Sequence, residues 1–180
     1  MNQLQIVTFL FLLLGCNHPE SNQYDRDHKS RVSISANSEA SLLEAETENG
    51  YKVIGIKDGD TFVVLIDGKE QVVRFAHIDC PEKNQPFGSR AKQFLSEMCY
   101  GKYVILIHKN KFDRNKRLIA EVILHDGTNL NKELVKNGLA WHYKSYSNDN
   151  TYADLENKAR ELKVGLWVDN NPIPPWTWRK

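Results

Sequence analysis

Residues 74 to 83, RFAHIDCPEK, place an arginine and two acids where a predicted strand leaves its sheet. A strand that only had to pack would end in an ordinary Gly or Asn turn. Asp79 and Glu82 can accept a proton or bind a hard cation, and Arg74 can bind an anion. The stretch therefore predicts a site where chemistry takes place.

Two further segments carry charges of the same kinds. DGDT, residues 58 to 61, holds two acids, and DRNKR, residues 113 to 117, ends in Arg117. DGDT alone is better explained as an ordinary turn, and a surface cluster of salt bridges would explain any single segment. The three segments together favour one site over three unrelated turns.

In this order and at these places, the three segments resemble those of the staphylococcal nuclease family. The likeness covers about residues 50 to 168 and includes NKELVKNGLAWHY and the closing GLW. The end of the chain, NPIPPWTWRK, resembles that of exported bacterial members. The resemblance implies a calcium-dependent nuclease that hydrolyses the phosphodiester bonds of DNA and RNA and leaves 3′-phosphates.

The resemblance also implies a metal site. Its Ca²⁺ ligands would be Asp60, Asp79 and the backbone carbonyl of Cys80, where the best-known member has threonine. Two carboxylates and one carbonyl leave several coordination positions for water and a substrate phosphate. We therefore expect a weak and open calcium site.

The catalytic roles implied by the resemblance are Glu82 as general base and Arg74 with Arg117 as the phosphate-binding pair. Attack on a phosphodiester requires water to lose a proton. The phosphorus, which is already surrounded by negative oxygens, must then accept a further negative oxygen. A carboxylate and two guanidinium groups meet these needs, because arginine can bind two phosphate oxygens and stays charged beside an acid.

Substrate contacts are predicted from the basic segment HKNKFDRNKR, residues 108 to 117, and from WHYKSY, residues 141 to 146. Arg114 and Lys116 can follow a nucleic-acid backbone, although such a charge run can equally be a solvated face. Tyr146 aligns with a base-packing tyrosine of the family, or it flanks the core. Asn115 and Lys116 replace a Tyr-Gly pair of the best-known member, which removes a phosphate-contacting hydroxyl.

The elements that must position these residues follow from periodicity. Alternating apolar residues and Asp-Gly turns predict five strands, over residues 51–57, 61–67, 70–78, 102–109 and 117–125. Helical spacing predicts three helices, over residues 88–101, 129–138 and 151–165. This order fits an α+β fold with a mainly β core, a five-stranded OB-fold Greek-key barrel with three helices.

Three local predictions accompany this fold. Thr151 and Asp154 have the spacing of a capping box at the start of the last helix. His77 is expected within a strand as a structural histidine. Cys80 and Cys99 can form a disulfide in an exported protein, or each can be a small buried residue.

The N-terminal part of the chain differs in composition. Residues 1–16 have no charged side chain, and their apolar run is too short to span a bilayer but suits a signal peptide. LLGC resembles the lipobox of bacterial lipoproteins and would make Cys16 the lipidated residue; an ordinary cleaved signal is the alternative. Residues 17–48 are polar, net acidic and predicted to be a disordered tether.

The remainder is a nuclease-like domain over residues 49–170 and a Pro/Trp-rich tail over residues 171–180. The 180-residue chain is 41% hydrophobic with a net charge of +1, and the domain is mildly basic, which permits an anionic partner such as DNA or RNA. We expect a monomer exported to the cell membrane or outer membrane as a lipoprotein, or else secreted or periplasmic. The alternative function is a non-catalytic OB-fold module that binds nucleic acid or protein.

Overall fold

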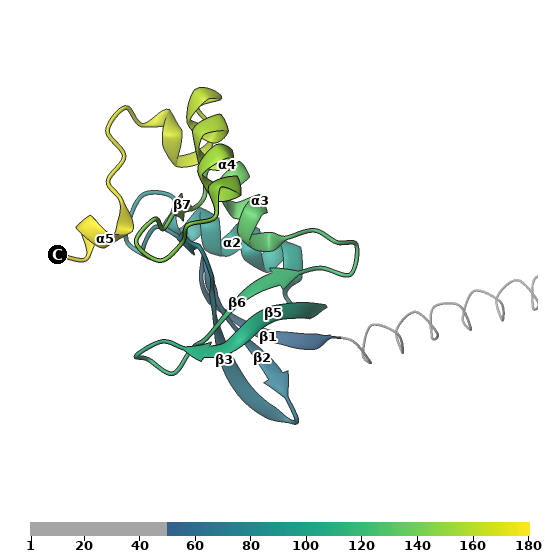
Figure 1. The fold of residues 1–180 in the computed structure, drawn as a ribbon. Coiled ribbons are helices and arrows are strands. Elements are labelled where there is room, and N and C mark those ends of the chain that lie inside the picture. The colour runs from purple at the N-terminus through teal and green to yellow at the C-terminus, as the bar shows by residue number, and fades with distance from the viewer. Residues whose placement is uncertain (1–49) are drawn as a thin grey trace, which may run out of the picture. The chain divides into compact units, whose positions relative to one another are not determined.

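The computed structural model describes residues 50–180 (Figure 1). The predicted signal peptide, the tether and Cys16 lie outside the described residues. The strands are β1 (Tyr51–Asp58), β2 (Thr61–Ile66), β3 (Lys69–Phe75), β4 (Ile78–Asp79), β5 (Tyr103–Phe112), β6 (Leu118–Ile123) and β7 (Trp141–His142). The helices are α2 (Gly88–Cys99), α3 (Leu130–Lys136), α4 (Asn150–Glu161), the 3₁₀ helix η1 (Gly165–Val168) and α5 (Pro175–Trp178).

Five strands form a closed barrel in the order β1-β2-β3-β6-β5. All neighbouring pairs are antiparallel except β3 with β6, which run parallel. This confirms the predicted five-stranded OB-type barrel and its three main helices. The short strands β4 and β7 pair separately, outside the barrel.

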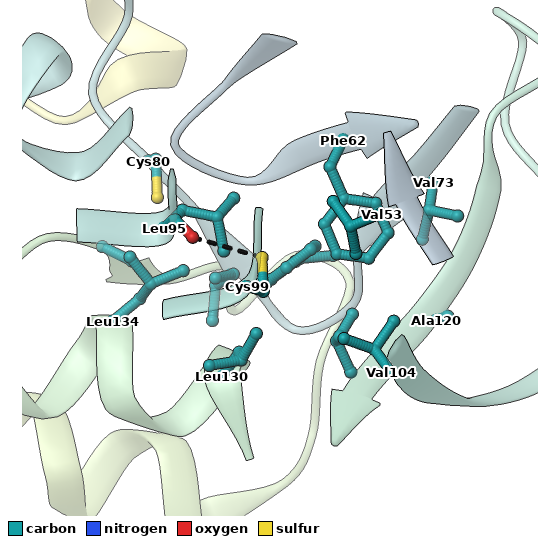
Figure 2. Packing of buried hydrophobic residues seen from close by; sticks show 14 of the residues in the cluster. Val53, Phe62, Val73, Cys80, Leu95, Cys99, Val104, Ala120, Leu130 and Leu134 are labelled. Carbon is teal, nitrogen blue, oxygen red and sulfur yellow. Dashed lines mark hydrogen bonds between the residues drawn. The ribbon is translucent and has the colours of Figure 1, made fainter. Parts of the chain in front are cut away.

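The core fills the barrel and continues beneath α2 and α3 (Figure 2). Phe62 and Phe75 meet edge to face inside it, with ring centroids 5.1 Å apart. The predicted apolar face of α2 is buried at Ala91, Leu95 and Cys99, with Phe94 and Met98 packed at its margin. Leu130, Leu134 and Val135 of α3 are also buried.

Both cysteines of the described residues are free and buried. The Cys99 thiol donates to the backbone carbonyl of Leu95, at 3.2 Å, within α2 (Figure 2). Of the two alternatives drawn from the sequence, the structure has the small buried residue.

The predicted strand over residues 70–78 is interrupted, which corrects the placement of His77. β3 ends at Phe75, and His77 adopts a left-handed backbone with φ 68°. The chain is held at this break because Asn131 donates to the carbonyl of Ala76 and the amide of Tyr143 donates to the carbonyl of His77. Ile78 and Asp79 then pair with β7 instead of continuing the barrel strand.

Two other boundaries differ from the prediction. β5 continues to Phe112 through a register shift between His108 and Phe112, where Asn110 has a positive φ, so the strand predicted to end at residue 109 is longer. Helix α4 is capped by Asp149, whose carboxylate accepts from the amide of Thr151. The predicted Thr151–Asp154 capping box is therefore wrong, because a closer carboxylate already satisfies the first free amide.

The C-terminal segment, residues 169–180, includes α5 and lies against β7 (yellow in Figure 1). Trp176 packs edge to face on Trp141, with ring centroids 5.6 Å apart, and stacks on Tyr143, with ring centroids 5.3 Å apart. No helix between residues 50 and 180 has both the length and the apolar composition needed to cross a membrane.

Candidate active site

The first acid of the site lies in the tight turn between β1 and β2. Asp60 is buried, and its Oδ2 accepts a 2.6 Å hydrogen bond from the amide of Cys80. Gly59 makes this approach possible, because a Cβ there would lie 2.7 Å from the Cβ of Ala91 and 2.9 Å from that of Cys80. The turn is therefore packed directly against the segment that follows β4.

Arg74 of β3 joins the two acids. Its guanidinium lies 3.1 Å from Asp60 Oδ2 and 2.7 Å from Asp79 Oδ1. It also donates to the backbone carbonyls of Phe75 and Ile78. Arg74 therefore joins the carboxylate of the β1–β2 turn and the carboxylate of β4 in one site.

The surroundings of Asp60 disfavour its ionised form. Burial, opposed by Arg74 and reinforced by the like charges of Asp58 and Asp79, raises the pKa of Asp60 to about 7. Desolvation and like charges both penalise the ionised carboxylate. An additional cation beside Asp60 would therefore relieve repulsion that the protein leaves in place.

Asp79 and Glu82 are separated in the chain by Cys80 and Pro81, and their side chains differ in exposure. The Asp79 side chain is 2% exposed and that of Glu82 is 40% exposed. The Glu82 amide donates to Gln85 Oε1 at 3.0 Å. Gly88, at the start of α2, lets the helix approach this segment, since a Cβ there would meet the carbonyl oxygen of Glu82 at 1.9 Å.

Arg117 reaches the same site from the residue before β6. Its guanidinium is oriented by Asp113 at 2.7 Å and donates to Thr61 Oγ1 at 3.3 Å. The Thr61 hydroxyl in turn donates to Asp60 Oδ1 at 3.2 Å. A continuous chain of hydrogen bonds therefore connects the second arginine to the first acid.

The residues predicted to contact substrate lie at the surface. Arg114 and Lys116 are exposed in the turn between β5 and β6, next to Arg117. Tyr146 is 77% exposed and its ring lies 4.7 Å from that of Tyr143. Within residues 50–180, no hydrogen bond connects Arg114, Lys116 or Tyr146 to the acids.

Arg179 is a charged residue of the site that the sequence interpretation missed. It contacts Asp79 Oδ2 at 2.7 Å and Glu82 Oε1 at 2.5 Å, from the C-terminal segment. The tryptophans around it in PWTWRK indicate a docked segment, but nothing in their spacing indicates what the arginine contacts. Arg179 and Glu82 are 97 positions apart.

The residues present fit a calcium ion. Asp60, Asp79 and the carbonyl of Cys80 offer only oxygen donors, which suit a hard cation. Between residues 50 and 180, no three His, Cys, Asp or Glu side chains are grouped closely enough to hold a metal. Backbone oxygen, water or substrate would have to complete the coordination.

Comparison with known proteins agrees with this arrangement. A family model described as staphylococcal nuclease homologue matches residues 72–169. An endonuclease of Haemophilus influenzae, described as uncharacterized, is 45% identical over 134 residues, 74% of this chain and 74% of that protein. A micrococcal nuclease of Shigella flexneri is 36% identical over 138 residues, 72% of this chain and 79% of that protein.

A plant protein is also similar. The staphylococcal-like nuclease CAN1 of Arabidopsis thaliana is 34% identical over 133 residues, 73% of this chain and 39% of that protein. The family model matches more than half of the chain, the bacterial relatives are similar over most of their length, and the five-stranded barrel is closed. The chain therefore belongs to the staphylococcal nuclease family.

Proposed function

We propose that this protein is a calcium-dependent nuclease that hydrolyses phosphodiester bonds in DNA and RNA and leaves 3′-phosphates. Family membership supports the nuclease activity. The observation that carries the finer proposal is the meeting of Asp60, Asp79 and Arg117 with the guanidinium of Arg74 between the two acids. These residues come from strands and turns far apart in the chain.

Asp60, Asp79 and the carbonyl of Cys80 are the proposed calcium ligands. When bound, the ion supplies positive charge that stabilises the extra negative charge on the phosphate in the transition state. Burial of both carboxylates keeps competing water away from their oxygens, and the hydrogen bond from the Cys80 amide fixes Asp60. The backbone can then present the Cys80 carbonyl without help from its side chain.

Glu82 is the proposed general base. Its Oε1 accepts from Arg179, whereas its Oε2 accepts no hydrogen bond from any of residues 50–180. The half-exposed side chain lets a water molecule reach this second oxygen. Glu82 can therefore take a proton from water while its first oxygen holds its position.

Arg74 and Arg117 are proposed to bind the phosphate. Arg117 is the more accessible, with its side chain 27% exposed against 13% for Arg74. Asp113 aligns the Arg117 guanidinium before substrate arrives, which lowers the entropy lost on binding. Arg74 additionally keeps the two buried acids in place.

Arg114 and Lys116 are proposed to contact the nucleic-acid backbone, and Tyr146 to stack on a base. All three are exposed near charged or aromatic neighbours. Backbone contacts and stacking are tolerant of sequence and of the sugar, which accords with action on both DNA and RNA.

The test is hydrolysis of one single-stranded DNA and one RNA, each with Ca²⁺, with Mg²⁺ and with excess chelator. We expect cleavage of both polymers with Ca²⁺, little with Mg²⁺ and none with chelator, because Mg²⁺ requires strict octahedral geometry. Product ends are assigned by whether a phosphatase must act before the 3′ end can be extended. Binding without hydrolysis under every condition would instead indicate the non-catalytic module.

A further inference from the structure

The C-terminal segment is firmly docked beside the site. Its Pro175 is buried, and Trp176 packs on Trp141 of β7 and on Tyr143. Aromatic pairs in these geometries add to the free energy gained by burial. The backbone before Arg179 is therefore held in one place, so its guanidinium approaches the acids from a defined direction.

Two separate contacts connect this segment to Glu82. Gln85, which is buried, donates from Nε2 to the carbonyl of Ile173 and accepts from the amide of Glu82 at Oε1. Arg179 contacts the carboxylate of the same residue. The segment thus holds Glu82 through its backbone and through its side chain.

Arg179 is the only partner of the Glu82 carboxylate among residues 50–180. A half-exposed glutamate is free to occupy many rotamers, and holding it in one of them costs conformational entropy. The planar guanidinium of Arg179 also contacts buried Asp79, so it fixes the flexible carboxylate relative to a rigid one.

From these contacts we infer that Arg179 is a positioning residue of the active site, which acts by holding the Glu82 carboxylate in place for catalysis. The inference rests on the proposed role of Glu82 as general base. Docking of Pro175 and Trp176 then contributes to catalysis, because it holds the backbone that carries Arg179.

A competing explanation is that Arg179 excludes a cation from Asp79, since guanidinium groups contact both oxygens of that carboxylate. Positioning is favoured for two reasons. A carboxylate has about four acceptor positions, so Asp79 can keep Arg179 and bind a cation as well. Arg179 also engages just one oxygen of Glu82 and leaves the other for water.

The experiment compares Arg179→Ala, Arg179→Lys and the matched control Lys180→Ala. Lys180 is the adjacent positive charge and forms no ion pair with the described residues. Measured quantities are kcat and KM on a short single-stranded DNA at saturating Ca²⁺, Ca²⁺ affinity by calorimetry, and the melting temperature of the full chain.

For Arg179→Ala we expect kcat to fall by about 10- to 100-fold, the range for a misplaced catalytic group, with KM and Ca²⁺ affinity within about threefold of wild type. Arg179→Lys should recover part of the loss, because an ammonium donates to only one carboxylate well. Lys180→Ala should behave as wild type.

A double-mutant cycle separates positioning from a general structural effect. In a Glu82→Gln background, Arg179→Ala should lower kcat by less than about twofold, since the group that it positions is already gone. If Arg179→Ala melts at a much lower temperature than wild type, Gln85→Ala tests whether the C-terminal segment positions Glu82, because it removes the link between the Glu82 backbone and Ile173. Gln85→Ala should lower kcat and leave the Ca²⁺ affinity unchanged.

Failure of the inference is distinct from failure of the proposed function. If the wild-type protein cleaves neither polymer, the nuclease proposal is wrong. If it does cleave but Arg179→Ala keeps its kcat, or shows equal losses with and without Glu82, positioning is wrong. Tighter Ca²⁺ binding by Arg179→Ala with undiminished turnover would establish the competing role of a cation substitute.

Discussion

Glu82 is the most exposed of the three acids in the site, and this suits a residue that must meet water. Asp60 and Asp79 are almost completely buried and are fixed by amide and guanidinium donors. A buried acid is rigid enough to bind a cation, whereas a proton acceptor must be reached by its substrate. The difference in burial therefore matches the division of roles proposed for the three carboxylates.

Glu82→Gln should lower kcat by about 10²- to 10⁴-fold, because glutamine keeps the size of the side chain but cannot accept the proton. Affinity for a short oligonucleotide with Ca²⁺ should remain. Steady-state kinetics and equilibrium binding on the same oligonucleotide provide both values. Turnover within a few-fold of wild type would show that another group removes the proton.

Asp60→Asn should weaken Ca²⁺ binding beyond the range of about 10⁻⁴ to 10⁻³ M expected for an open extracellular site. The amide has one neutral oxygen in place of an ionised carboxylate. Isothermal titration of each protein with CaCl₂ measures this, and Asp67→Asn, the same change in the exposed β2–β3 turn, is the control. Equal affinities in all three proteins would exclude Asp60 as a ligand.

At the scale of the elements, the site depends on close packing between the segments that carry its acids and the neighbouring helices. Glycines at two of these junctions allow the approach, Gly59 beneath Asp60 and Gly88 beneath Glu82. Glu121 of β6 connects to the start of α3 through Asn129 and to α4 through Tyr152. These contacts determine how precisely the site residues are positioned at the edge of the barrel.

Gly88→Ala should destabilise the fold by about 1–3 kcal/mol, the usual cost of overpacking, and should lower kcat as well. The added methyl group meets the backbone carbonyl of Glu82, so either α2 or the Glu82 segment must move. Gly55→Ala is the control, because its Cβ would meet nothing nearer than 3.7 Å. Urea unfolding and kinetics of both variants test this, and equal behaviour would contradict it.

Glu121→Gln should lower stability by about 1.5–3 kcal/mol at neutral pH, the range for hydrogen bonds to a charged group. Hydrogen bonding by His77, opposed by burial and joined by Asn129 and Tyr152, lowers the pKa of Glu121 from 4.5 to about 2. A depressed pKa in the folded state means stability that is present above about pH 4.5 and is lost as the pH falls toward 2.

The measurement is the free energy of unfolding of wild type and Glu121→Gln between pH 2 and 7. The difference between them should be largest above pH 4.5 and should shrink below it. Glu70→Gln, at an exposed position of β3, is the control. A difference that does not change with pH would mean that packing of the side chain, and not its charge, is what stabilises the fold.

At the scale of the whole molecule, a mildly basic nuclease domain follows a net acidic segment and an uncharged N-terminal stretch in the sequence. We propose export of the chain and anchoring through a lipidated Cys16, with a monomeric domain acting outside the cytoplasm. Attachment through more than one acyl chain would hold such a protein stably at a membrane.

Cys16→Ser should shift the protein from the membrane fraction to the soluble fraction or leave it unprocessed, because the residue that receives lipid is absent. Cell fractionation with immunodetection, supported by the mass of the mature N-terminus, measures this. Cys99→Ser, which alters a buried cysteine of the domain, is the control for loss of a thiol. Equal membrane association of Cys16→Ser and wild type would rule out the anchor.

The sequence alone determined the barrel class and the succession of five barrel strands and three main helices along the chain. Alternating and helical periodicities are local, because they arise from which neighbouring side chains share one face. The charged residues Asp60, Arg74, Asp79 and Arg117 were also identifiable, because their three segments together resemble those of the nuclease family. Local spacing was misleading where a competing group stood nearby, as at Asp149, which caps α4 in place of Thr151.

Only the tertiary structure decided how these segments meet. The break at His77 turns Asp79 away from the barrel strand and toward β7, yet the apolar run around it reads as continuous strand. The contact of Arg179 with Asp79 and Glu82 joins residues about a hundred positions apart. Such contacts depend on the path of the whole chain and on docking of Trp176, so no short-range pattern encodes them.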